Sequence, residues 1–224
     1  MNIIQKPKLC TAFTVADLLA VMIVVFVFVA VFLPALVPRR ARVRSRISCV
    51  NNLKQVGLAF RMWSDDNNSK YPMAYAGDTN YPLINYGTNW QSAAVEYEFT
   101  VFESMSNELS TPKFIVCPQD KRIAATNFTT DLNSSHVSYF VGLDAEEIRP
   151  GSFLAGDWNL TNGRNPVKGI LNLRTNQNPR WTKDMHNQNG NVAMGDGSVL
   201  QMNNSQLKTY LVKTGLGTNT LLFP

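Results

Sequence analysis

The chain has 224 residues, 45% of them hydrophobic, and a formal net charge of +5. This length allows one membrane-spanning segment and one modest folded domain, and it excludes a second domain of similar size. The charge does not indicate nucleic-acid binding, because seven of the 21 basic residues flank an apolar segment near the amino terminus. The rest of the chain, from Ile47 onward, contains 14 basic and 15 acidic residues, so its net charge is close to zero.

That apolar segment is the most distinctive stretch of the sequence. Every residue from Leu18 to Val37 is apolar, and a helix of this length covers about 30 Å, the thickness of a bilayer's hydrocarbon core. The segment is too long for the apolar part of a secretory signal peptide, and no small-residue cleavage site follows it. We therefore predict that residues 13–37 form a transmembrane helix that stays on the protein.

A short polar leader precedes this helix. Residues 1–12 have two lysines as their only charged side chains and end in the small residue Ala12. An acidic residue, Asp17, stands four positions after Phe13. This arrangement resembles the signal of prepilin-type cleavage and methylation proteins, with Ala12 in place of the usual glycine and Asp17 in place of the usual glutamate. An ordinary signal anchor with an incidental aspartate is the alternative.

The resemblance implies that a prepilin peptidase cuts between Ala12 and Phe13 on the cytoplasmic face, and that the new amino terminus is methylated. It also implies that Asp17 takes part in assembly, where a buried carboxylate needs a cation such as the free amine of a neighbouring Phe13. We then expect a single-pass protein of the inner membrane, with its leader in the cytoplasm and its carboxy-terminal domain in the periplasm.

Residues 38–66 are predicted to form a basic collar and an amphipathic helix that continues from the membrane. Five arginines lie between Arg39 and Arg46, and the positive-inside rule applied to them alone favours a cytoplasmic domain. We interpret them as headgroup anchors, because the leader is the more specific signal. Beyond them, apolar residues recur at steps of three and four and predict one buried helical face: Ile47, Val50, Leu53, Val56, Phe60 and Trp63.

The remaining residues, 67–224, are expected to form one soluble domain of the α+β class. A second amphipathic helix is predicted over Ala93–Leu109, and a last helix, capped by Ser205, over Gln206–Lys213. Short apolar runs between turn-forming residues predict strands: Phe114–Cys117, Val137–Leu143, Ser152–Trp158, Gly169–Leu173 and Thr220–Phe223.

A hairpin is predicted near the carboxyl end, where Asp196 and Gly197 separate two apolar runs. An Asp-Gly pair between strands favours a tight primed turn, which needs a positive φ at both central residues. Nine residues separate His186 from this pair. The spacing resembles the H-X9-DG signature of a group of prepilin-type proteins, and the run from Cys49 to Asn68 resembles the same group.

Together these resemblances imply a pilin-like fold, in which a long amino-terminal membrane helix packs on a small antiparallel β-sheet. They imply a structural function without enzymatic activity: a pseudopilin-like subunit, assembled into a filament of a type II secretion or type IV pilus-like system. Prepilin peptidase, other pilin-like subunits and the inner membrane would be its partners. The sequence also lacks a Gly-rich phosphate loop and the G-x-S-x-G and H-E-x-x-H motifs.

Two sets of residues in the soluble domain invite a chemical interpretation. Cys49 and Cys117 are the cysteines left after the leader, and an oxidising periplasm could join them, although two separate buried thiols fit the sequence equally well. A calcium ion is the conceivable cofactor, with oxygen and nitrogen ligands from Asp157, Asn159, His186 and Asp196. We favour an architectural role instead, in which His186 bonds a carbonyl or a carboxylate such as Asp157 or Asp184.

The alternative function is a membrane-tethered periplasmic binding domain that does not polymerise. Such a domain could recognise polysaccharide through aromatic side chains: Tyr71, Tyr75, Trp90, Trp158 and Trp181. Clustering of these rings on one exposed face would favour the binding domain, and their burial would favour the structural subunit.

Overall fold

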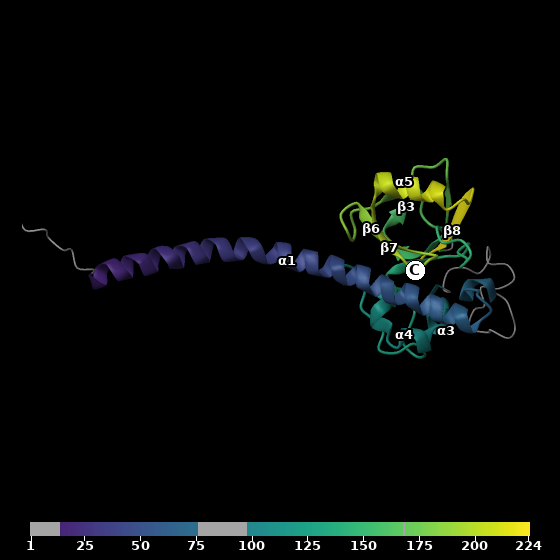
Figure 1. Cartoon of the computed structure of the whole chain (residues 1–224), viewed down its shortest axis with the longest axis horizontal. Coiled ribbons are helices and arrows are strands. Elements are labelled where there is room, and N and C mark those ends of the chain that lie inside the picture. Colours follow the sequence, from purple (N-terminus) through teal and green to yellow (C-terminus); the bar gives the residue numbers. More distant parts are fainter. Residues whose placement is uncertain (1–13, 76–97, 168) are drawn as a thin grey trace, which may run out of the picture. The chain divides into compact units, whose positions relative to one another are not determined.

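A computed structural model describes residues 14–75, 98–167 and 169–224. The predicted leader, the cleavage position before Phe13 and the ring of Trp90 lie outside these residues. The chain divides into two compact units between Arg44 and Ser45. The α+β class is confirmed, with an amino-terminal apolar helix and an antiparallel sheet (Figure 1).

Helix α1, Val15–Asp66, contributes to both units. In the first unit, Val15–Phe32 is long and apolar enough to cross a membrane, and none of these residues is buried within the protein. It is the one helix with these properties among the described residues. The prediction of a single apolar helix near the amino terminus is thus confirmed.

In the second unit, α1 buries the face that the apolar periodicity predicts. Four of the six predicted residues are at most 5% exposed: Leu53, Val56, Phe60 and Trp63. Cys49, Ala59 and Ser64 are buried beside them. Val50 is only partly buried, and Ile47 is 57% exposed, because the buried face begins only at Cys49. The helix ends at Asp66 because Asn68 and Ser69 adopt left-handed backbone conformations that break the helical hydrogen-bond pattern.

The sheet of the second unit has six strands in the order β4-β8-β1-β2-β6-β7, and every strand pair is antiparallel. The strands are β1 (Tyr139–Gly142), β2 (Phe153–Asp157), β4 (Ile170–Arg174), β6 (Asn189–Met194), β7 (Val199–Asn203) and β8 (Thr218–Leu222). A separate pair joins β3 (Leu160–Thr161) to β5 (Arg180–Trp181).

Both faces of the six-stranded sheet are covered. Successive side chains of a strand point to opposite faces, and accordingly Tyr139 and Val141 of β1 belong to the core that includes α1, whereas Phe140 belongs to a second core. That second core includes Leu207 and Leu211 of α5 (Asn204–Lys213). The sheet therefore lies between α5 and the part of α1 from Cys49 onward (Figure 1).

Two predicted elements differ from the structure. The segment Phe114–Cys117 is no strand, because Pro112–Ile115 forms a short 3-10 helix, η3, capped by the side chain of Thr111. The predicted helix Ala93–Leu109 is described only from residue 98, as α3 (Glu98–Ser104) and α4 (Ser106–Leu109). Two further short 3-10 helices in the described ranges are η1 (Pro72–Tyr75) and η4 (Ser134–His136).

The cap of α5 also differs from the prediction. Asn203, and not Ser205, caps this helix: its side-chain oxygen accepts a hydrogen bond from Gln206 N, and the Gln206 side chain accepts one from Asn203 N. This reciprocal capping box moves the helix start two residues upstream of the predicted one.

Candidate functional site

The segment from His186 to Gly197, here called the signature segment, contacts α1 at both of its ends. Its middle is strand β6, which pairs with β2 on one side and β7 on the other. Its first end contacts the disulfide that includes Cys49, and its second end contacts Arg61. The segment thereby connects the sheet to two points of the helix that lie about three turns apart.

At the second end, β6 and β7 are joined by a three-residue loop, Gly195 to Gly197. Gly197 N donates to Met194 O over 2.8 Å, and Met194 N donates to Ser198 O over 2.8 Å. Gly197 has a φ of +81°, but Asp196 is not among the residues with positive φ. The prediction of a primed turn is therefore wrong: the loop is a type I turn followed by a left-handed glycine, which is the usual three-residue hairpin connection.

The tip of this hairpin rests on α1 and on the segment that follows it. Arg61 Nη1 donates to the carbonyl oxygen of Asp196 over 2.8 Å, and the hydroxyl of Tyr71 donates to the carbonyl oxygen of Gly195 over 2.7 Å. Burial raises the pKa of Tyr71 to about 12, and the nearby carboxylate of Glu147 adds to this shift. The hairpin tip is thus held by backbone carbonyls that accept from two long side chains.

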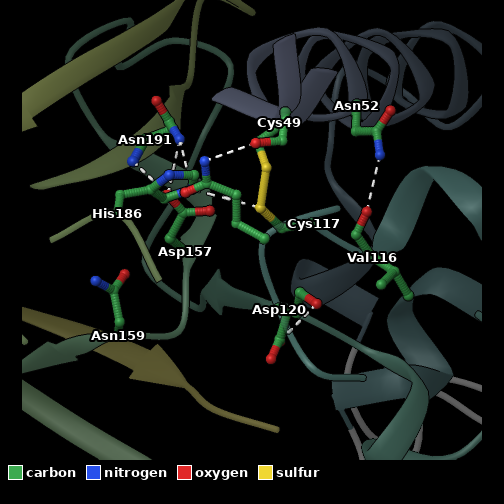
Figure 2. The surroundings of a disulfide bond; sticks show 12 residues. Cys49, Asn52, Val116, Cys117, Asp120, Asp157, Asn159, His186 and Asn191 are labelled. Atoms are coloured by element: carbon green, nitrogen blue, oxygen red, sulfur yellow. Dashed lines mark hydrogen bonds and ion pairs between the residues drawn. A yellow bond between two sulfur atoms is a disulfide. The ribbon is translucent and has the colours of Figure 1, made fainter. Parts of the chain in front are cut away.

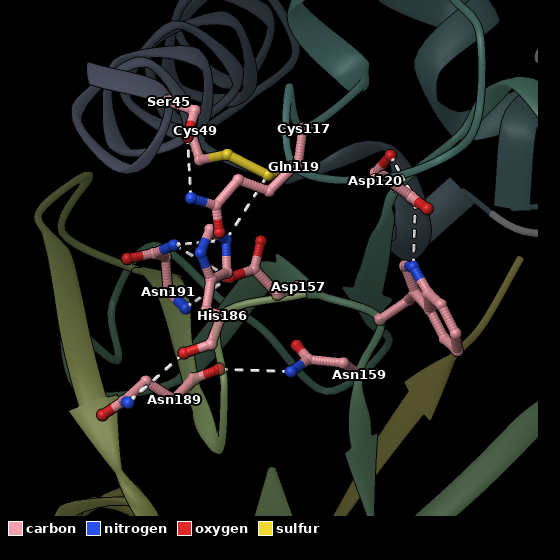
Figure 3. A network of polar contacts seen from close by, with 12 residues as sticks. Ser45, Cys49, Cys117, Gln119, Asp120, Asp157, Asn159, His186, Asn189 and Asn191 are labelled. Carbon is pink, nitrogen blue, oxygen red and sulfur yellow. Dashed lines mark hydrogen bonds and ion pairs between the residues drawn. A yellow bond between two sulfur atoms is a disulfide. The ribbon is translucent and has the colours of Figure 1, made fainter. Parts of the chain in front are cut away.

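At the first end, the side chain of His186 is fully buried beside the carboxylate of Asp157. The distance from His186 Nε2 to Asp157 Oδ2 is 3.2 Å (Figure 3). The same carboxylate oxygen accepts from the backbone N of Asn191 over 2.7 Å and from its side-chain Nδ2 over 2.8 Å. The pair thus bridges β2, which ends at Asp157, and β6. Of the two predicted carboxylate partners of His186, the structure pairs it with Asp157, whereas Asp184 accepts from the hydroxyl of Thr182.

The atoms around Nε2 of His186 indicate which ring nitrogen carries the proton. Both Asn191 Nδ2 and Asp157 Oδ2 lie 3.2 Å from His186 Nε2, and the amide donates one of its two hydrogens to the same carboxylate oxygen. A bare Nε2 would direct its lone pair at the carboxylate, so the favoured form carries the proton on Nε2 and donates to Asp157.

Two left-handed residues, Asn187 (φ +52°) and Gln188 (φ +62°), reverse the chain directly after His186 and direct β6 back along the sheet.

Cys49 and Cys117 form a fully buried disulfide above this pair, with their Cα atoms 4.9 Å apart (Figure 2). Cys117 Sγ lies 3.4 Å from His186 Nε2. One turn after Cys49, Asn52 Nδ2 donates to the carbonyl oxygen of Val116 over 2.8 Å. The disulfide and this hydrogen bond together attach α1 to the segment that follows η3.

Several buried polar atoms around the pair have no hydrogen-bond partner among the described residues. They are Asp157 Oδ1, His186 Nδ1, Asn191 Oδ1 and Asn159 Oδ1. Burial, and the negative charge of Asp157, raise the pKa of Tyr139 well above its ordinary value. A buried polar atom without a partner costs free energy. The atoms named above can therefore form further bonds that the surrounding chain does not supply.

The four predicted calcium ligands do not come together. Asn159 is fully buried, but its amide donates to the carbonyl oxygens of Thr182 and Asn189. Asp196 lies five residues beyond Asn191, or about 17 Å along an extended strand, and its carboxylate accepts from Ser198 N. Across the described ranges, one group of three potential metal ligands has atoms within 4.8 Å of one another: Cys49, Cys117 and His186.

The cluster has the residue types of a Cys-His-Asp catalytic triad but not its geometry. In a triad the carboxylate orients one ring nitrogen and the nucleophile faces the other. Here Asp157 Oδ2 and Cys117 Sγ both lie near Nε2 of His186, and all three side chains are fully buried. The arrangement can hold a proton and cross-link three segments of chain, and it offers a substrate no access.

No protein-family model, curated protein or solved structure matches this chain. Its function is therefore argued from its own residues.

Sequence reasoning missed Asn191 and Arg61. Asn191 donates twice to Asp157, and the signal that could have revealed it is a polar residue directly before the apolar run that leads to the hairpin. Arg61 donates to the hairpin tip from a solvent-exposed position on α1, which gives no distinctive sequence signal.

At the amino-terminal end of α1, Asp17 is bonded within its own chain. Thr14 donates to Asp17 Oδ2 from its backbone N over 2.9 Å and from its hydroxyl over 2.7 Å. In return, Asp17 N donates to Thr14 Oγ1 over 3.3 Å. This reciprocal pattern is a capping box, which satisfies backbone donors at the start of the helix.

Proposed function

We propose that the protein is a membrane-anchored, pilin-like structural subunit, processed between Ala12 and Phe13 and assembled with like subunits. The observation that carries the proposal is helix α1. Its Val15–Phe32 part is apolar and entirely exposed, whereas its part from Cys49 to Trp63 is buried against the sheet. One helix that combines a membrane anchor with the central core element of a small α+β domain is the arrangement expected of a pilin subunit.

The attachment of α1 to its domain fits a structural role. A subunit in a filament transmits force between its membrane helix and its globular part, so the helix must not separate from the sheet. Here the disulfide of Cys49 holds the helix at one level, and Arg61 holds it at a second through the hairpin tip. The signature segment joins the two levels, which gives His186 and Gly197 an architectural purpose.

The disulfide also supports the proposed orientation. Disulfides persist in oxidising compartments and are rare where cellular thiols keep cysteines reduced. A buried Cys49–Cys117 bond therefore favours a periplasmic domain over the cytoplasmic domain that the five collar arginines alone would indicate.

The polysaccharide-binding alternative gains less support. Of its candidate aromatic residues, Tyr71 and Trp181 are 1% exposed. Tyr75 is partly buried, with its ring centre 5.5 Å from that of Trp63. Trp158 is half-buried, with the Arg122 guanidinium 4.7 Å from its ring centre. An open hollow of about 450 Å³ is lined by side-chain amides, two arginines and aliphatic side chains, and no aromatic ring lines it within the described part of the chain. This hollow therefore offers a sugar no aromatic ring to stack on.

Processing can be tested by co-expressing the full chain with a prepilin peptidase and determining the amino terminus by mass spectrometry of the membrane fraction. We expect a chain that begins at Phe13, and an Ala12→Gly variant that is processed at least as completely. A catalytically inactive peptidase is the matched control. Retention of Met1 in both variants with an active peptidase would contradict the proposal.

Assembly needs its own experiment. Membranes that contain the processed chain are treated with an amine-reactive cross-linker and compared with membranes in which the peptidase is inactive. We expect a ladder of multimers only after processing. A processed chain that stays monomeric at all expression levels would instead favour the membrane-tethered binding domain.

A further inference from the structure

We propose that, when its disulfide is reduced, this domain binds one zinc-type divalent ion through Cys49, Cys117, His186 and Asp157. The proposal concerns a second chemical state of the buried cluster and does not depend on the pilin-like function. The ligand atoms of the two cysteines and the histidine lie within 4.8 Å of one another, and all three residues are fully buried.

The distances fit a tetrahedral site. With zinc–sulfur bonds of about 2.3 Å and zinc–nitrogen or zinc–oxygen bonds of about 2.0 Å, neighbouring ligand atoms are separated by about 3.5 Å for sulfur and nitrogen and about 3.3 Å for nitrogen and oxygen. His186 Nε2 lies 3.4 Å from Cys117 Sγ and 3.2 Å from Asp157 Oδ2. Two of the spacings in the site, both measured from His186 Nε2, thus already match those of tetrahedral neighbours.

The fourth ligand needs only a side-chain movement. Once the sulfur–sulfur bond is broken, rotation about the Cα–Cβ bonds separates the sulfur atoms without displacing the backbone. The backbone around them is fixed independently, because Asn52 of α1 remains bonded to Val116 O, directly before Cys117. Cys49 and Cys117 lie on the same side of His186 (Figure 2), and we expect them to stay there after reduction.

The surroundings of Asp157 match those of a metal-ligating carboxylate. Such carboxylates are usually held by outer hydrogen bonds, and Asp157 Oδ2 accepts two from Asn191. Asp157 Oδ1 and His186 Nδ1 are buried with no partner among the described residues. Coordination through Nε2 moves the imidazole proton to Nδ1, and it gives the buried negative charge of Asp157 a cation.

The reaction is balanced as follows. A phosphine reductant takes an oxygen atom from water to become the phosphine oxide, and the two cysteines gain two electrons and two protons. Binding of one divalent ion then releases the two thiol protons and forms two metal–thiolate bonds. A cellular dithiol would serve equally, becoming a disulfide itself. Since the metal bridges the same two cysteines, it keeps α1 attached where thiols stay reduced.

The test uses the full chain in detergent with Cys10→Ser, which leaves two thiols, and Co²⁺ as the probe. After phosphine reduction we expect one equivalent of Co²⁺ to bind with the intense visible bands of tetrahedral thiolate coordination, and the oxidised chain to show none. His186→Asn should lose this spectrum, whereas His136→Asn, which changes the chain's other histidine, should keep it.

Folding is followed in the same samples by near-ultraviolet circular dichroism and thermal melting. If the reduced metal-free chain stays folded, Zn²⁺ should raise its melting temperature and leave that of the oxidised chain unchanged. If the reduced chain unfolds, Zn²⁺ should restore the native spectrum. Absence of Co²⁺ binding by the reduced chain would overturn the proposal. So would thiolate bands that survive in His186→Asn, or a reduced chain that Zn²⁺ neither stabilises nor refolds.

Discussion

The Nε2 atom of His186 lies 3.2 Å from Oδ2 of Asp157, and both side chains are fully buried. Asp157 is the last residue of β2, and His186 precedes β6 by three residues, so their contact ties the end of β2 to the segment that leads into β6. Breaking a buried pair by removing one partner is costly, because the other partner is left in a dry environment without compensation.

We therefore predict that Asp157→Ala lowers the free energy of unfolding by about 3 kcal/mol. The substitution deprives both Asn191 donors and the His186 ring of their shared acceptor. Urea unfolding of the full chain in detergent measures the loss. Asp184→Ala is the matched control, because this exposed carboxylate contacts only the neighbouring Thr182 in the described structure and should change little. Equal effects of the two substitutions would contradict an architectural role for the pair.

The disulfide gives a second prediction. Replacing both Cys49 and Cys117 by alanine should destabilise the domain by about 4 kcal/mol, because their separation of 68 residues in the sequence closes a long loop in the unfolded chain. Thermal and urea melts of the oxidised wild type and the double variant test this value. Cys10→Ser should melt like the wild type. A double variant as stable as the wild type would show that the cross-link adds nothing to the fold.

Much of the helical architecture can be predicted from periodicity alone. Apolar steps of three and four from Leu53 to Trp63 predict the buried face of α1, because a helix places such residues on one side. The same pattern includes Ile47, which is exposed. Periodicity describes the helix but does not tell where the covering domain begins, which depends on tertiary contacts.

The hairpin and the cluster show where local reasoning ends. An Asp-Gly pair predicts a reversal at Asp196, but the strand register adds Gly195 to the loop and so changes the turn type. Residue type alone suggests that His186 and Asp157 are partners. It also wrongly groups Asp196 with them as a ligand of the same calcium ion. The intervening strand β6 carries Asp196 to the other end of the sheet, and only the topology reveals this separation.

Gly197 provides a third prediction, which separates backbone strain from packing. A Cβ atom at this position would combine a φ of +81° with an approach of 3.0 Å to Arg61 Cδ, whereas at Gly215 the φ is +72° and the space is open. Gly215→Ala should thus cost about 1 kcal/mol through strain alone. Gly197→Ala should cost clearly more, because it also disturbs the hairpin tip on α1. Equal losses in urea melts would mean that the contact with Arg61 is unimportant. The bulkier Gly197→Val should cost at least as much as Gly197→Ala.

Tyr71 predicts the response to alkaline pH. Its pKa is about 12 in the folded protein and about 10 in an unfolded chain. Below pH 10 both states keep the proton, but between about pH 10 and 12 only the unfolded state loses it, so the free energy of unfolding falls by up to about 2 to 3 kcal/mol as the pH rises. Tyr71→Phe should be less stable at about pH 8, because it lacks the bond to Gly195 O, and should lose less stability on going to about pH 11. Parallel pH profiles of the wild type and the variant would contradict this assignment.

Asp17 gives the last prediction, in which its charge and its capping function are separated. Asp17→Asn keeps a side-chain oxygen that can accept from Thr14 but removes the negative charge, whereas Thr14→Val removes the hydroxyl and keeps the charge. If Asp17 pairs with the amine of a neighbouring Phe13, Asp17→Asn should insert and be processed normally but form few multimers, while Thr14→Val should assemble.

The readouts are the amino terminus by mass spectrometry, which shows that both variants are processed, and the yield of cross-linked multimers. Asp17→Glu, which restores the charge with a longer side chain, should assemble at least as well as the wild type. The opposite ranking, with normal multimers from Asp17→Asn and few from Thr14→Val, would assign Asp17 to the capping of α1 alone. An intersubunit contact requires the charge, and a helix cap requires only the oxygen.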